Sequence, residues 1–335
     1  MVNIKENISL KPYHTFHINV RANYFAEYDT VEELKSLLTL PLLKDNRYLH
    51  IGGGSNLLFT KDFEGVIIHS RMKEINLLSE DDKSVLINVQ SGMVWDDFVS
   101  YCVSKGWGGV ENMSHIPGEV GASAVQNVGA YGVEAKDVIH SVQVLDVKTF
   151  DEHTFTNAEC HYSYRKSIFK EALKGLYIIT SVTFRLQKEP VFRLDYGNLI
   201  SQTGENPTLA TVREAVINIR RLKLPDPEEI GSAGSFFINP IVDEESYKVL
   251  KTEYSQMPSY PLQGGKIKLS AAWLIDHAGW HGKSIGGASV YPKQCLVIVN
   301  NNNATAGDVT ALAEAIRKSV YEKYRVDITP EVNYI

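Results

Sequence analysis

Cysteine is scarce in this chain. Only three occur among 335 residues, Cys102, Cys160 and Cys295, and they lie far apart with no Cys-x-x-Cys pair. This spacing argues against a disulfide framework and against a zinc cluster built from paired cysteines. A reducing compartment fits this cysteine usage best.

Long apolar runs and an excess of positive charge are also missing. Lys5 and Glu6 interrupt the first ten residues, and no stretch approaches the length of a membrane span. Lysine plus arginine number 34 against 40 for aspartate plus glutamate, which gives a net charge of −6. Because nucleic-acid binding draws on a basic field, this balance disfavours such a partner. We expect a cytoplasmic protein that binds neither membrane nor nucleic acid, with room for a basic pocket around a small phosphorylated ligand.

The remaining composition is that of an ordinary globular protein, with 44% hydrophobic and 22% charged residues. At this length we expect two or three domains rather than one. Apolar periodicity predicts helices and strands of mixed order. The predicted helices are 30–40, 94–105, 208–222, 270–278 and 308–324, and the predicted strands are 85–89, 142–147, 177–186 and 295–300. A domain boundary is expected at 224–227 (LPDP), because its two prolines prevent the preceding helix from continuing.

The first segment with chemical content is a glycine cluster after a predicted strand, 51–58 (IGGGSNLL). Glycines permit positive φ angles, so successive backbone N–H groups can converge on a pyrophosphate, with Ser55 and Asn56 adding donors. The segment is not a dinucleotide-binding fingerprint, because Leu57 occupies the last glycine position. A plain tight turn explains a glycine triplet equally well.

A second glycine-rich stretch, 116–132, contains IPGEVGA and QNVGAYG. It lacks helical or strand periodicity, so we expect a long irregular segment. Such segments are uncommon inside a compact domain unless they have a function. Its glycines would let the backbone wrap closely round an extended ligand, and we favour this interpretation over a structureless loop.

Two further segments place polar side chains among aromatics. Arg165 lies between tyrosines and hydroxyls in 162–169, where a partly desolvated guanidinium could bind a carboxylate bidentately, although a surface salt bridge is the commoner role. Ser235 precedes two phenylalanines in 231–240 and could donate a proton if shielded from water, with a turn serine as the alternative. The segment is not a nucleophile elbow, because Phe237 stands where the final glycine belongs.

A phosphate-binding loop and a histidine metal site are both disfavoured near residue 280. The segment 279–284 (GWHGKS) ends like a P-loop, but His277 stands where that pattern needs glycine. His277 and His281 are four residues apart, yet Gly279 lies between them and the sequence places no third ligand nearby. We therefore expect structural histidines and no metal site.

Taken together, these motifs resemble the UDP-N-acetylenolpyruvoylglucosamine reductases, the MurB family, which are flavin-dependent enzymes of peptidoglycan precursor synthesis. The matching blocks run in order over nearly the whole chain. They are GGGSN at 52–56, IPGEVGA at 116–122, QNVGAYG at 126–132, YRKSIFK at 164–170, KLPDP at 223–227, AGSFFINP at 233–240 and PEV at 330–332. The resemblance implies an α+β fold, with a two-subdomain FAD-binding region of the PCMH (vanillyl-alcohol-oxidase) type and a smaller α+β substrate-binding domain.

The same resemblance implies a division of the chain. Residues 1–70 would form the first FAD-binding subdomain and 71–218 the second, with the PCMH-type region spanning about 17–188. Residues 219–320 would bind substrate, and 321–335 would return to the active site. FAD is expected to be non-covalent, because covalent relatives attach it through a histidine in the glycine turn and 52–56 contains none, although His50 lies just upstream. NADPH is the expected co-substrate, UDP-N-acetylglucosamine enolpyruvate the expected substrate, and the protein is expected to be a monomer.

Residue roles follow from the matching motifs. The family's catalytic arginine, serine and glutamate fall on Arg165, Ser235 and Glu331. The expected FAD-binding residues are Gly52, Gly53, Gly54, Ser55, Asn56, Leu57, Ile116, Pro117, Gly118, Gly121, Ala122, Gln126, Asn127, Gly129, Ala130, Tyr131 and Gly132. The expected substrate contacts are Tyr164, Tyr196, Lys223, Asn239, Tyr260, Lys268 and Gln294. Tyr196, in 195–199 (DYGNL), matches the tyrosine loop of the family's longer subtype, which folds over bound substrate.

The chemistry implied by the resemblance has two half-reactions: NADPH reduces FAD, and the reduced flavin then converts the enolpyruvyl ether to UDP-N-acetylmuramate. Arg165 would stabilise the enolate charge, Glu331 would assist by a hydrogen bond, and Ser235 would supply a proton in a dry pocket. Lys223 and Lys268 would offset the diphosphate charge. An FAD oxidase of the same fold acting on another small molecule is one alternative. A catalytically silent nucleotide-sugar binding protein is another, although such a protein would not need a proton donor beside the flavin.

Three positions depart from the family's usual residues. His115 stands where glycine is common, Glu119 where a small or apolar residue is frequent, and Ile238 where lysine is common. Glu119 matters most, because a carboxylate near a pyrophosphate is repulsive unless it points to solvent. We expect these changes to affect the details of the flavin loop and not its presence.

Overall fold

The computed structural model describes residues 3–196 and 198–335. Met1 and Val2, which belong to the predicted first subdomain, and Gly197 of the predicted tyrosine loop lie outside the described residues. The chain divides into two compact units. The first unit comprises 1–8, 22–53 and 64–220, and the second comprises 9–21, 54–63 and 221–335.

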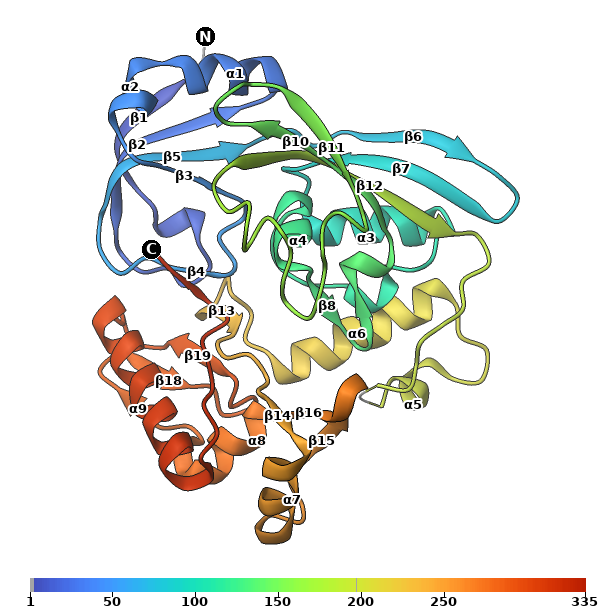
Figure 1. Ribbon diagram of the computed structural model, residues 1–335, viewed down its shortest axis with the longest axis vertical. Helices are drawn as coiled ribbons and strands as arrows, with labels where there is room; N and C mark the ends of the chain where they lie inside the picture. Colours follow the sequence, from blue (N-terminus) through green and yellow to red (C-terminus); the bar gives the residue numbers. More distant parts are fainter. Residues whose placement is uncertain (1–2, 197) are drawn as a thin grey trace. The chain divides into compact units, whose positions relative to one another are not determined.

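Two sheets form the framework of the first unit (Figure 1). The four-stranded sheet has the order β1-β2-β5-β3, from β1 (Ile4–Ser9), β2 (Arg21–Tyr28), β3 (Tyr48–Ile51) and β5 (Phe63–Ser70). The five-stranded sheet has the order β11-β10-β12-β7-β6, from β6 (Ile75–Glu80), β7 (Ser84–Gln90), β10 (Ile139–Asp146), β11 (Glu152–Thr156) and β12 (Tyr177–Gln187). A short hairpin pairs β8 (Gly129–Ala130) with β9 (Val133–Glu134).

The helices that begin in this unit follow from apolar periodicity and capping. They are α1 (Val31–Thr39), α2 (Pro41–Asp45), α3 (Trp95–Ser104), α4 (Val120–Gln126), α5 (Leu199–Thr203) and α6 (Leu209–Lys223). Thr30 caps α1 by accepting the Glu33 N–H at 3.1 Å, and the apolar face of this helix is buried. In Figure 1, α3 and α4 lie against the five-stranded sheet, where Phe98 of α3 and Phe184 of β12 place their ring centroids 4.6 Å apart.

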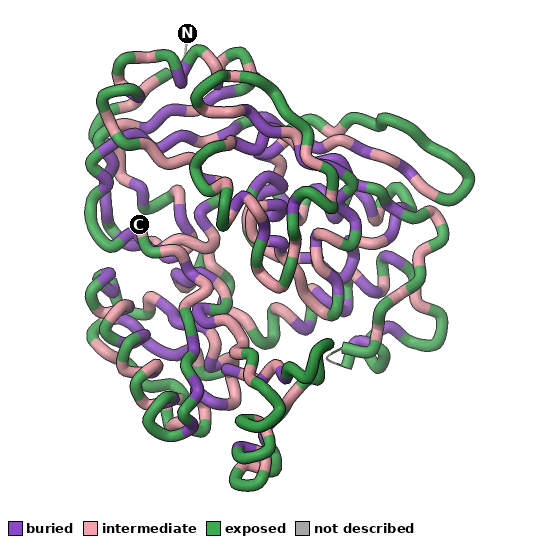
Figure 2. The backbone as a smooth tube through the Cα atoms, in the orientation of Figure 1, coloured by how far each residue is buried: buried purple, intermediate pink, exposed green. Residues whose placement is uncertain are grey.

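Burial alternates along the central strands of the five-stranded sheet. Val85, Ile87 and Val89 of β7 are buried, whereas the residues between them are only half-buried, as expected when one sheet face covers a core. Figure 2 shows this alternation as buried and intermediate segments along the strands. Most of β6 is exposed, which fits its place at the edge of the sheet.

The second unit contains smaller sheets. One has the order β13-β19-β18-β17, from β13 (Gly231–Ser235), β17 (Ser284–Ile285), β18 (Ala288–Val290) and β19 (Val297–Asn300). A second has the order β14-β16-β15, from β14 (Ile241–Asp243), β15 (Ser259–Pro261) and β16 (Lys266–Leu269), and a third pairs β4 (Leu57–Leu58) with β20 (Asn333–Tyr334). The helices are α7 (Glu244–Glu253), α8 (Ala271–Ile275) and α9 (Ala306–Tyr324).

Most predicted elements are confirmed within one or two residues, but two need correction. Helix 270–278 stops at Ile275 and continues as a wide π-type turn, Asp276–Trp280, in which Gly279 has a φ of 85°. The segment 116–132, expected to be irregular, contains α4 and the β8–β9 hairpin. Within the described residues, no helix has the length and apolar character needed to cross a bilayer.

Candidate functional site

The end of strand β3 and the start of α4 meet through small residues in the first unit. A Cβ added to Gly52 would lie 3.2 Å from Ala122 Cβ, and one added to Gly53 would lie 3.4 Å from Gly118 Cα. Gly53 and Ala122 are exposed, as is the intervening Pro117. The predicted positions Gly52, Gly53, Gly118 and Ala122 therefore share one partly exposed surface, beside the side chain of Glu119.

Glu119 does not point to solvent, so the condition set in the sequence analysis is not met. Its side chain is 9% exposed, and its Oε1 lies 2.8 Å from Nε2 of His69, whose Nδ1 is 3.4 Å from Oε1 of Glu27. Burial lowers the pKa of His69, but hydrogen bonds and charges from Glu119 and Glu27 outweigh it and raise the pKa above its usual range. The cation that this favours offsets the charge of Glu119 beside Gly52.

Asn127 joins α4 to the segments that follow it. It is fully buried and ends α4 in a left-handed conformation with a φ of 48°. Its Nδ2 donates to the Ser163 carbonyl at 2.9 Å and to Glu134 Oε2 at 3.1 Å, and its Oδ1 accepts the Lys136 N–H at 3.0 Å. The predicted flavin residue Asn127 is thus the centre of a local hydrogen-bond network.

The β8–β9 hairpin positions Tyr131. The turn residues Tyr131 and Gly132 both have positive φ, 48° and 81°, as a two-residue turn of the I′ type requires. Gly129 admits no side chain, because an added Cβ would lie 2.6 Å from the Val133 carbonyl oxygen. The ring of Tyr131 packs edge-to-face against Tyr196, with centroids 6.1 Å apart.

Arg165 is held by the segment that follows α4. Its NH2 group donates to the Gly129 carbonyl at 2.9 Å and its NH1 group to the Asn127 carbonyl at 3.4 Å. The guanidinium also lies 5.3 Å from the centre of the Tyr164 ring, within cation–π range. The hydrogen bonds to these two carbonyl oxygens orient the guanidinium without neutralising its charge. The predicted catalytic arginine is therefore held by the second glycine-rich stretch, 116–132.

Helix α4 and the segment 165–170 are joined at the side chain of Gln126. Lys170 Nζ donates to Gln126 Oε1 at 2.7 Å and to the Arg165 carbonyl at 3.3 Å. Ser167 Oγ donates to the Val125 carbonyl at 2.6 Å. The predicted neighbours Ile116 and Ala130 are half-buried, whereas Gly121 is buried against Ser91.

Arg220, at the last turn of α6, adds a second cation that the sequence analysis missed. Its Nε donates to the His115 carbonyl at 3.0 Å. Burial lowers its pKa, and the charge of Arg165 acts in the same direction, whereas Tyr131 and Asp96 oppose it. His115 itself has a φ of 59°, which explains why glycine suits this position. The only sequence signal for Arg220 was its place just before KLPDP.

In the second unit, the rest of the glycine cluster is bound to the end of the chain. The backbone carbonyl of Asn56 accepts the Asn333 N–H at 3.0 Å, and the Asn56 side-chain Nδ2 donates to the Glu331 carbonyl at 3.3 Å. Leu57 pairs with Asn333 in the parallel β4–β20 ladder. Gly54 has a φ of 64°, and an added Cβ would lie 2.2 Å from the Tyr13 carbonyl oxygen, so only glycine fits there. Ser55 is half-buried beside it.

The segments that carry Ser235 and Glu331 are paired antiparallel in this unit, through a bridge between Phe237 and Pro330. The Glu331 N–H donates to the Phe236 carbonyl at 2.8 Å, and Ile238 N–H donates to the Thr329 carbonyl at 2.9 Å. Phe236 and Phe237 are buried, which fixes the strand that carries Ser235. Ser235 is exposed and Glu331 is half-buried, so both side chains are accessible to a ligand.

The predicted substrate contacts of the second unit fall into separate groups. Lys268 of β16 pairs with Tyr260 of β15, and its Nζ lies 5.6 Å from the Tyr260 ring centre. Asn239 Oδ1 accepts the Ala271 N–H at 3.0 Å and thereby helps to start α8. Gln294 lines a pocket beside α8, and Lys223 is exposed at the end of α6.

The first-unit residues fit an extended flavin cofactor. An added Cβ on Gly52 or Gly53 would occupy space beside Gly118 and Ala122, which is the cradle that a bound pyrophosphate requires. Gly52, Gly53, Gly118 and Ala122 would hold the cofactor there. His50, just upstream, is directed to Tyr28, since its Nε2 lies 2.9 Å from the Tyr28 hydroxyl oxygen.

Comparison with protein-family models gives two matches. Residues 226–335 match the model described as UDP-N-acetylenolpyruvoylglucosamine reductase, C-terminal domain. Residues 22–149 match the model described as FAD binding domain. The two matches cover different parts of the chain.

Curated relatives match along the full length. A UDP-N-acetylenolpyruvoylglucosamine reductase of Bacteroides fragilis is 49% identical over 334 residues, which is 99% of this chain and 100% of the relative. The reductase of Porphyromonas gingivalis is 44% identical over 100% of both chains. The reductase of Neisseria gonorrhoeae is 44% identical over 99% of this chain and 97% of its own.

A solved structure shows the same fold. The UDP-N-acetylenolpyruvylglucosamine reductase (MurB) of Thermus caldophilus superposes with a TM-score of 0.71 at 22% identity, covering 100% of this chain and 99% of its own. Together with the FAD-binding match, this similarity confirms the predicted α+β fold class with an FAD-binding region. Since relatives at 44 to 49% identity span the whole chain, the chain belongs to the UDP-N-acetylenolpyruvoylglucosamine reductase (MurB) family.

Proposed function

We propose that this protein reduces the enolpyruvyl ether of UDP-N-acetylglucosamine to UDP-N-acetylmuramate, using NADPH and a non-covalently bound FAD. The observation that carries the proposal is the pairing of the two segments that carry Ser235 and Glu331, through the 2.8 Å hydrogen bond from the Glu331 N–H to the Phe236 carbonyl. A hydroxyl group and a carboxyl group on two paired segments are suited to act on one substrate. The bound flavin supplies the two-electron reduction.

Ser235 is proposed as the proton donor. A serine hydroxyl is a weak acid in water, so it needs a basic acceptor and a site from which water is excluded. Ser235 is exposed in the structure, and the substrate itself must therefore cover it. Glu331 is proposed to assist through a hydrogen bond to the substrate.

Arg165 is proposed to stabilise the negative charge that develops next to the substrate carboxylate. A guanidinium has five N–H donors, and the hydrogen bonds from Arg165 to the carbonyls of Asn127 and Gly129 set its orientation before substrate binds. Preorganised charge of this kind is more effective than a cation that must be ordered during the reaction. Arg220 adds positive charge to the same unit.

The remaining site residues are proposed with their sequence-derived roles. The positions at 52–57, 116–122 and 126–132 would hold FAD, and the predicted tyrosines, lysines, Asn239 and Gln294 would contact the nucleotide sugar. The pairing of Lys268 with Tyr260 supports a cationic and aromatic surface for a uridine diphosphate. We also propose the domain limits 1–70, 71–218, 219–320 and 321–335, a monomeric cytoplasmic protein, and a role in cell-wall precursor synthesis, cell shape and division.

The test separates the two half-reactions under anaerobic conditions. NADPH should bleach the flavin absorbance of the purified protein, and UDP-N-acetylglucosamine enolpyruvate should then restore it. The Ser235→Ala variant should be bleached by NADPH at the wild-type rate but should recover colour far more slowly with substrate. Ser232→Ala, a buried serine of the same strand, is the matched control and should behave as wild type.

Two outcomes would contradict the proposal. Equal rates of recovery in Ser235→Ala and wild type would remove Ser235 as proton donor. A protein that binds flavin but does not recover colour with the enolpyruvyl substrate would have the fold without the proposed substrate.

A further inference from the structure

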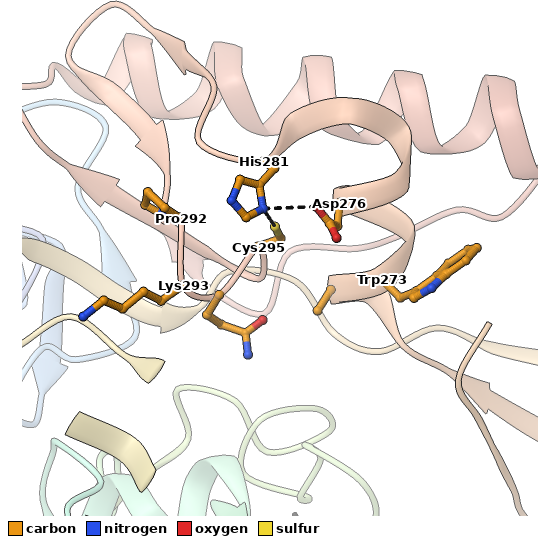
Figure 3. A pocket seen from close by; sticks show the side chains of 8 residues that line it. Trp273, Asp276, His281, Pro292, Lys293 and Cys295 are labelled. Carbon is orange, nitrogen blue, oxygen red and sulfur yellow. Dashed lines mark hydrogen bonds and ion pairs between the residues drawn. The ribbon is translucent and has the colours of Figure 1, made fainter. Parts of the chain in front are cut away.

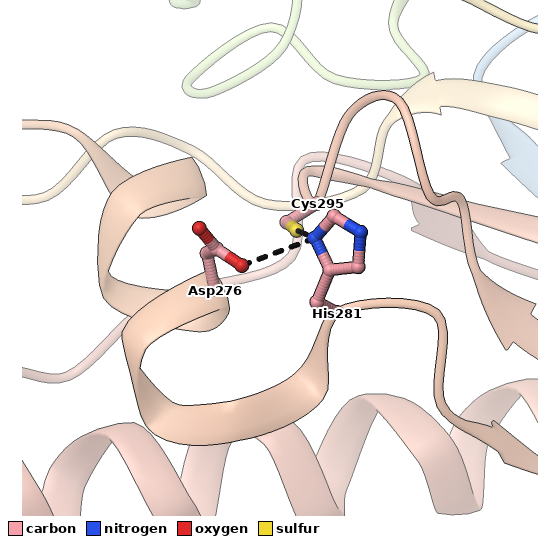
Figure 4. A group of neighbouring side chains, drawn as sticks. All are labelled: Asp276, His281 and Cys295. Atoms are coloured by element: carbon pink, nitrogen blue, oxygen red, sulfur yellow. Dashed lines mark hydrogen bonds and ion pairs between the residues drawn. The ribbon is translucent and has the colours of Figure 1, made fainter.

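Three side chains with metal-binding atoms converge beside α8 in the second unit. Asp276 begins the π-type turn after α8, His281 follows that turn, and Cys295 precedes β19. The His281 Nδ1 atom lies 3.1 Å from Asp276 Oδ1 and 3.7 Å from Cys295 Sγ, and all three ligand atoms lie within 4.8 Å of one another. Figure 4 shows the carboxylate and the sulfur on the same side of the imidazole, with dashed lines from its nitrogen to each.

These spacings suit tetrahedral coordination. With zinc bonds of about 2.0–2.3 Å to nitrogen, oxygen and sulfur, neighbouring ligand atoms of a tetrahedron lie about 3.4–3.6 Å apart. The two distances from His281 Nδ1 are within a few tenths of an ångström of this range. Small side-chain rotations would close the remaining edge between Asp276 and Cys295.

The local backbone supports the arrangement. Gly279, with a φ of 85°, lets the chain reverse tightly between Asp276 and His281, and Gly282, with a φ of 65°, turns it again after His281. Lys323 of α9 donates from Nζ to the His277 carbonyl at 2.6 Å and ties the turn to that helix. Asp276 and His281 are therefore held at the two ends of an anchored turn, and Cys295 is held shortly before the buried strand β19.

The neighbouring histidine, His277, makes its shortest contacts with Trp273, although its Nδ1 also lies 3.8 Å from Asp276 Oδ2. His277 stacks on Trp273 with ring centroids 3.8 Å apart and an interplanar angle of 17°, and its Nδ1 lies 3.0 Å from the Trp273 carbonyl oxygen. The sequence spacing suggested His277 and His281 as a pair, but the structure separates their roles. His281 meets Asp276 and Cys295 instead.

A pocket gives access to the cluster. Trp273, Asp276, His281, Lys293 and Cys295 are among its lining residues, and the Lys293 side chain extends away from the other polar groups (Figure 3). The side chains of Asp276 and His281 are 44% and 59% exposed, whereas Cys295 is only 6% exposed. An ion entering the pocket would meet the carboxylate and the imidazole first and the sulfur last.

We propose that Asp276, His281 and Cys295 form a binding site for one zinc-class divalent ion, with three protein ligands and a water molecule in the fourth position. One thiolate, one imidazole and one carboxylate favour zinc or cobalt over magnesium or calcium, which prefer oxygen ligands. The carboxylate of Asp276 and the thiolate of Cys295 together balance the two positive charges of the ion, so the bound site would have no net charge. The three proposed ligands are not among the residues proposed for the redox reaction, although the predicted substrate contact Gln294 lines the same pocket.

Metal binding at this site must release a proton. A cysteine thiol with its ordinary pKa of about 8.5 is mostly protonated near neutral pH. Because the thiolate is the ligand, the ion displaces that proton. Affinity should therefore rise with pH.

The test is calorimetric titration of the flavin-containing protein with zinc chloride after removal of metals, in two buffers with different ionisation enthalpies. We expect one ion per chain and release of about one proton. Cys295→Ser should abolish the proton release, and His281→Gln should weaken binding by more than about tenfold, since even loss of an outer partner of a ligand costs that much. His277→Gln is the matched control and should bind zinc like wild type.

Cobalt titration gives an independent readout, because a thiolate ligand adds a sulfur-to-cobalt absorption band that Cys295→Ser should lack. His281 is exposed, so His281→Gln keeps the test informative if Cys295→Ser does not fold. Wild-type affinity for zinc in His281→Gln, binding without proton release, or an equal loss in His277→Gln would each overturn the proposed ligand set. Absence of saturable binding in wild type would leave only a hydrogen-bonded trio.

Discussion

Replacement of Asn127 should destabilise the first unit strongly, because its buried side chain makes three hydrogen bonds to two other segments of the chain. Its three hydrogen bonds have lengths of 2.9–3.1 Å. At about 1 kcal/mol each, their loss removes about 3 kcal/mol. Alanine would also have to adopt a φ of 48°, at a cost of about 1–2 kcal/mol. Asn127→Ala should therefore lose about 4–5 kcal/mol of unfolding free energy.

Asn127→Gly separates the two contributions. Glycine loses the same hydrogen bonds but adopts the left-handed conformation freely, with about 0.5–1 kcal/mol lost to extra freedom in the unfolded chain. We expect Asn127→Gly to be the more stable variant by up to about 1 kcal/mol. Asn46→Ala is the control, because Asn46 ends α2 with a side-chain hydrogen bond to the Leu42 carbonyl and a φ of −123°. It should lose about 1 kcal/mol.

The measurement is urea unfolding followed by circular dichroism, together with hydrogen exchange of the peptide 127–136. The Lys136 amide is the most direct probe, since its acceptor is Asn127 Oδ1. A loss below about 2 kcal/mol in Asn127→Ala would refute the hydrogen-bond reasoning. An Asn127→Ala variant as stable as Asn127→Gly would refute the backbone reasoning.

Three further predictions concern the glycine turn, the buried histidine and the arginine. Gly54→Ala should prevent normal folding, because the added Cβ would lie 2.2 Å from the Tyr13 carbonyl oxygen. Gly106→Ala is the control: Gly106 has a φ of 76°, but an added Cβ would have no neighbouring atom within 4 Å. Thermal unfolding should show that it lowers the free energy of unfolding by only about 1–2 kcal/mol. Because the pKa of His69 is raised, its contribution to the free energy of unfolding is complete below the ordinary pKa of 6.5 and is lost as pH rises through the pKa of the folded protein. Wild type should therefore be more stable than His69→Gln by a larger margin at about pH 6 than at about pH 9. An equal margin at both pH values would contradict this. Arg165→Lys should retain flavin colour but lower kcat about 10²-fold or more in steady-state assays, and wild-type kcat would contradict the proposed role.

The helices of this chain were predictable where capping and apolar periodicity agreed. Thr305 and Asp308 form a capping box at the start of α9, and the buried stripe of that helix includes Val309, Leu312 and Ile316. Helix α4 was missed because VGASAVQ contains small residues with no apolar period. Its buried face is made of Val120, Gly121, Ser123 and Ala124, which pack closely because they are small.

The candidate site was predictable as motifs but not as contacts. The sequence singled out Arg165 and QNVGAYG separately, and only the fold shows that the carbonyls of Asn127 and Gly129 hold the guanidinium. Cys295 lies 14 residues beyond His281, so no local spacing rule connects them. Such pairs depend on how strands and turns meet in space, which residue periodicity does not encode.

Glu119 shows how a residue that conflicts with a local rule can be accommodated by a distant one. A buried carboxylate beside the expected pyrophosphate position would be repulsive, and desolvation would add to its cost. His69, 50 residues earlier, lies 2.8 Å away, and the raised pKa of its imidazole favours the cation that offsets the charge of this carboxylate. Glu27, 3.4 Å from the other ring nitrogen, favours the same protonated state. Glu119 is also the N-cap residue of α4, and its side chain lies beside Gly52. The Glu119–His69 pair is therefore next to the glycines that are expected to hold the pyrophosphate.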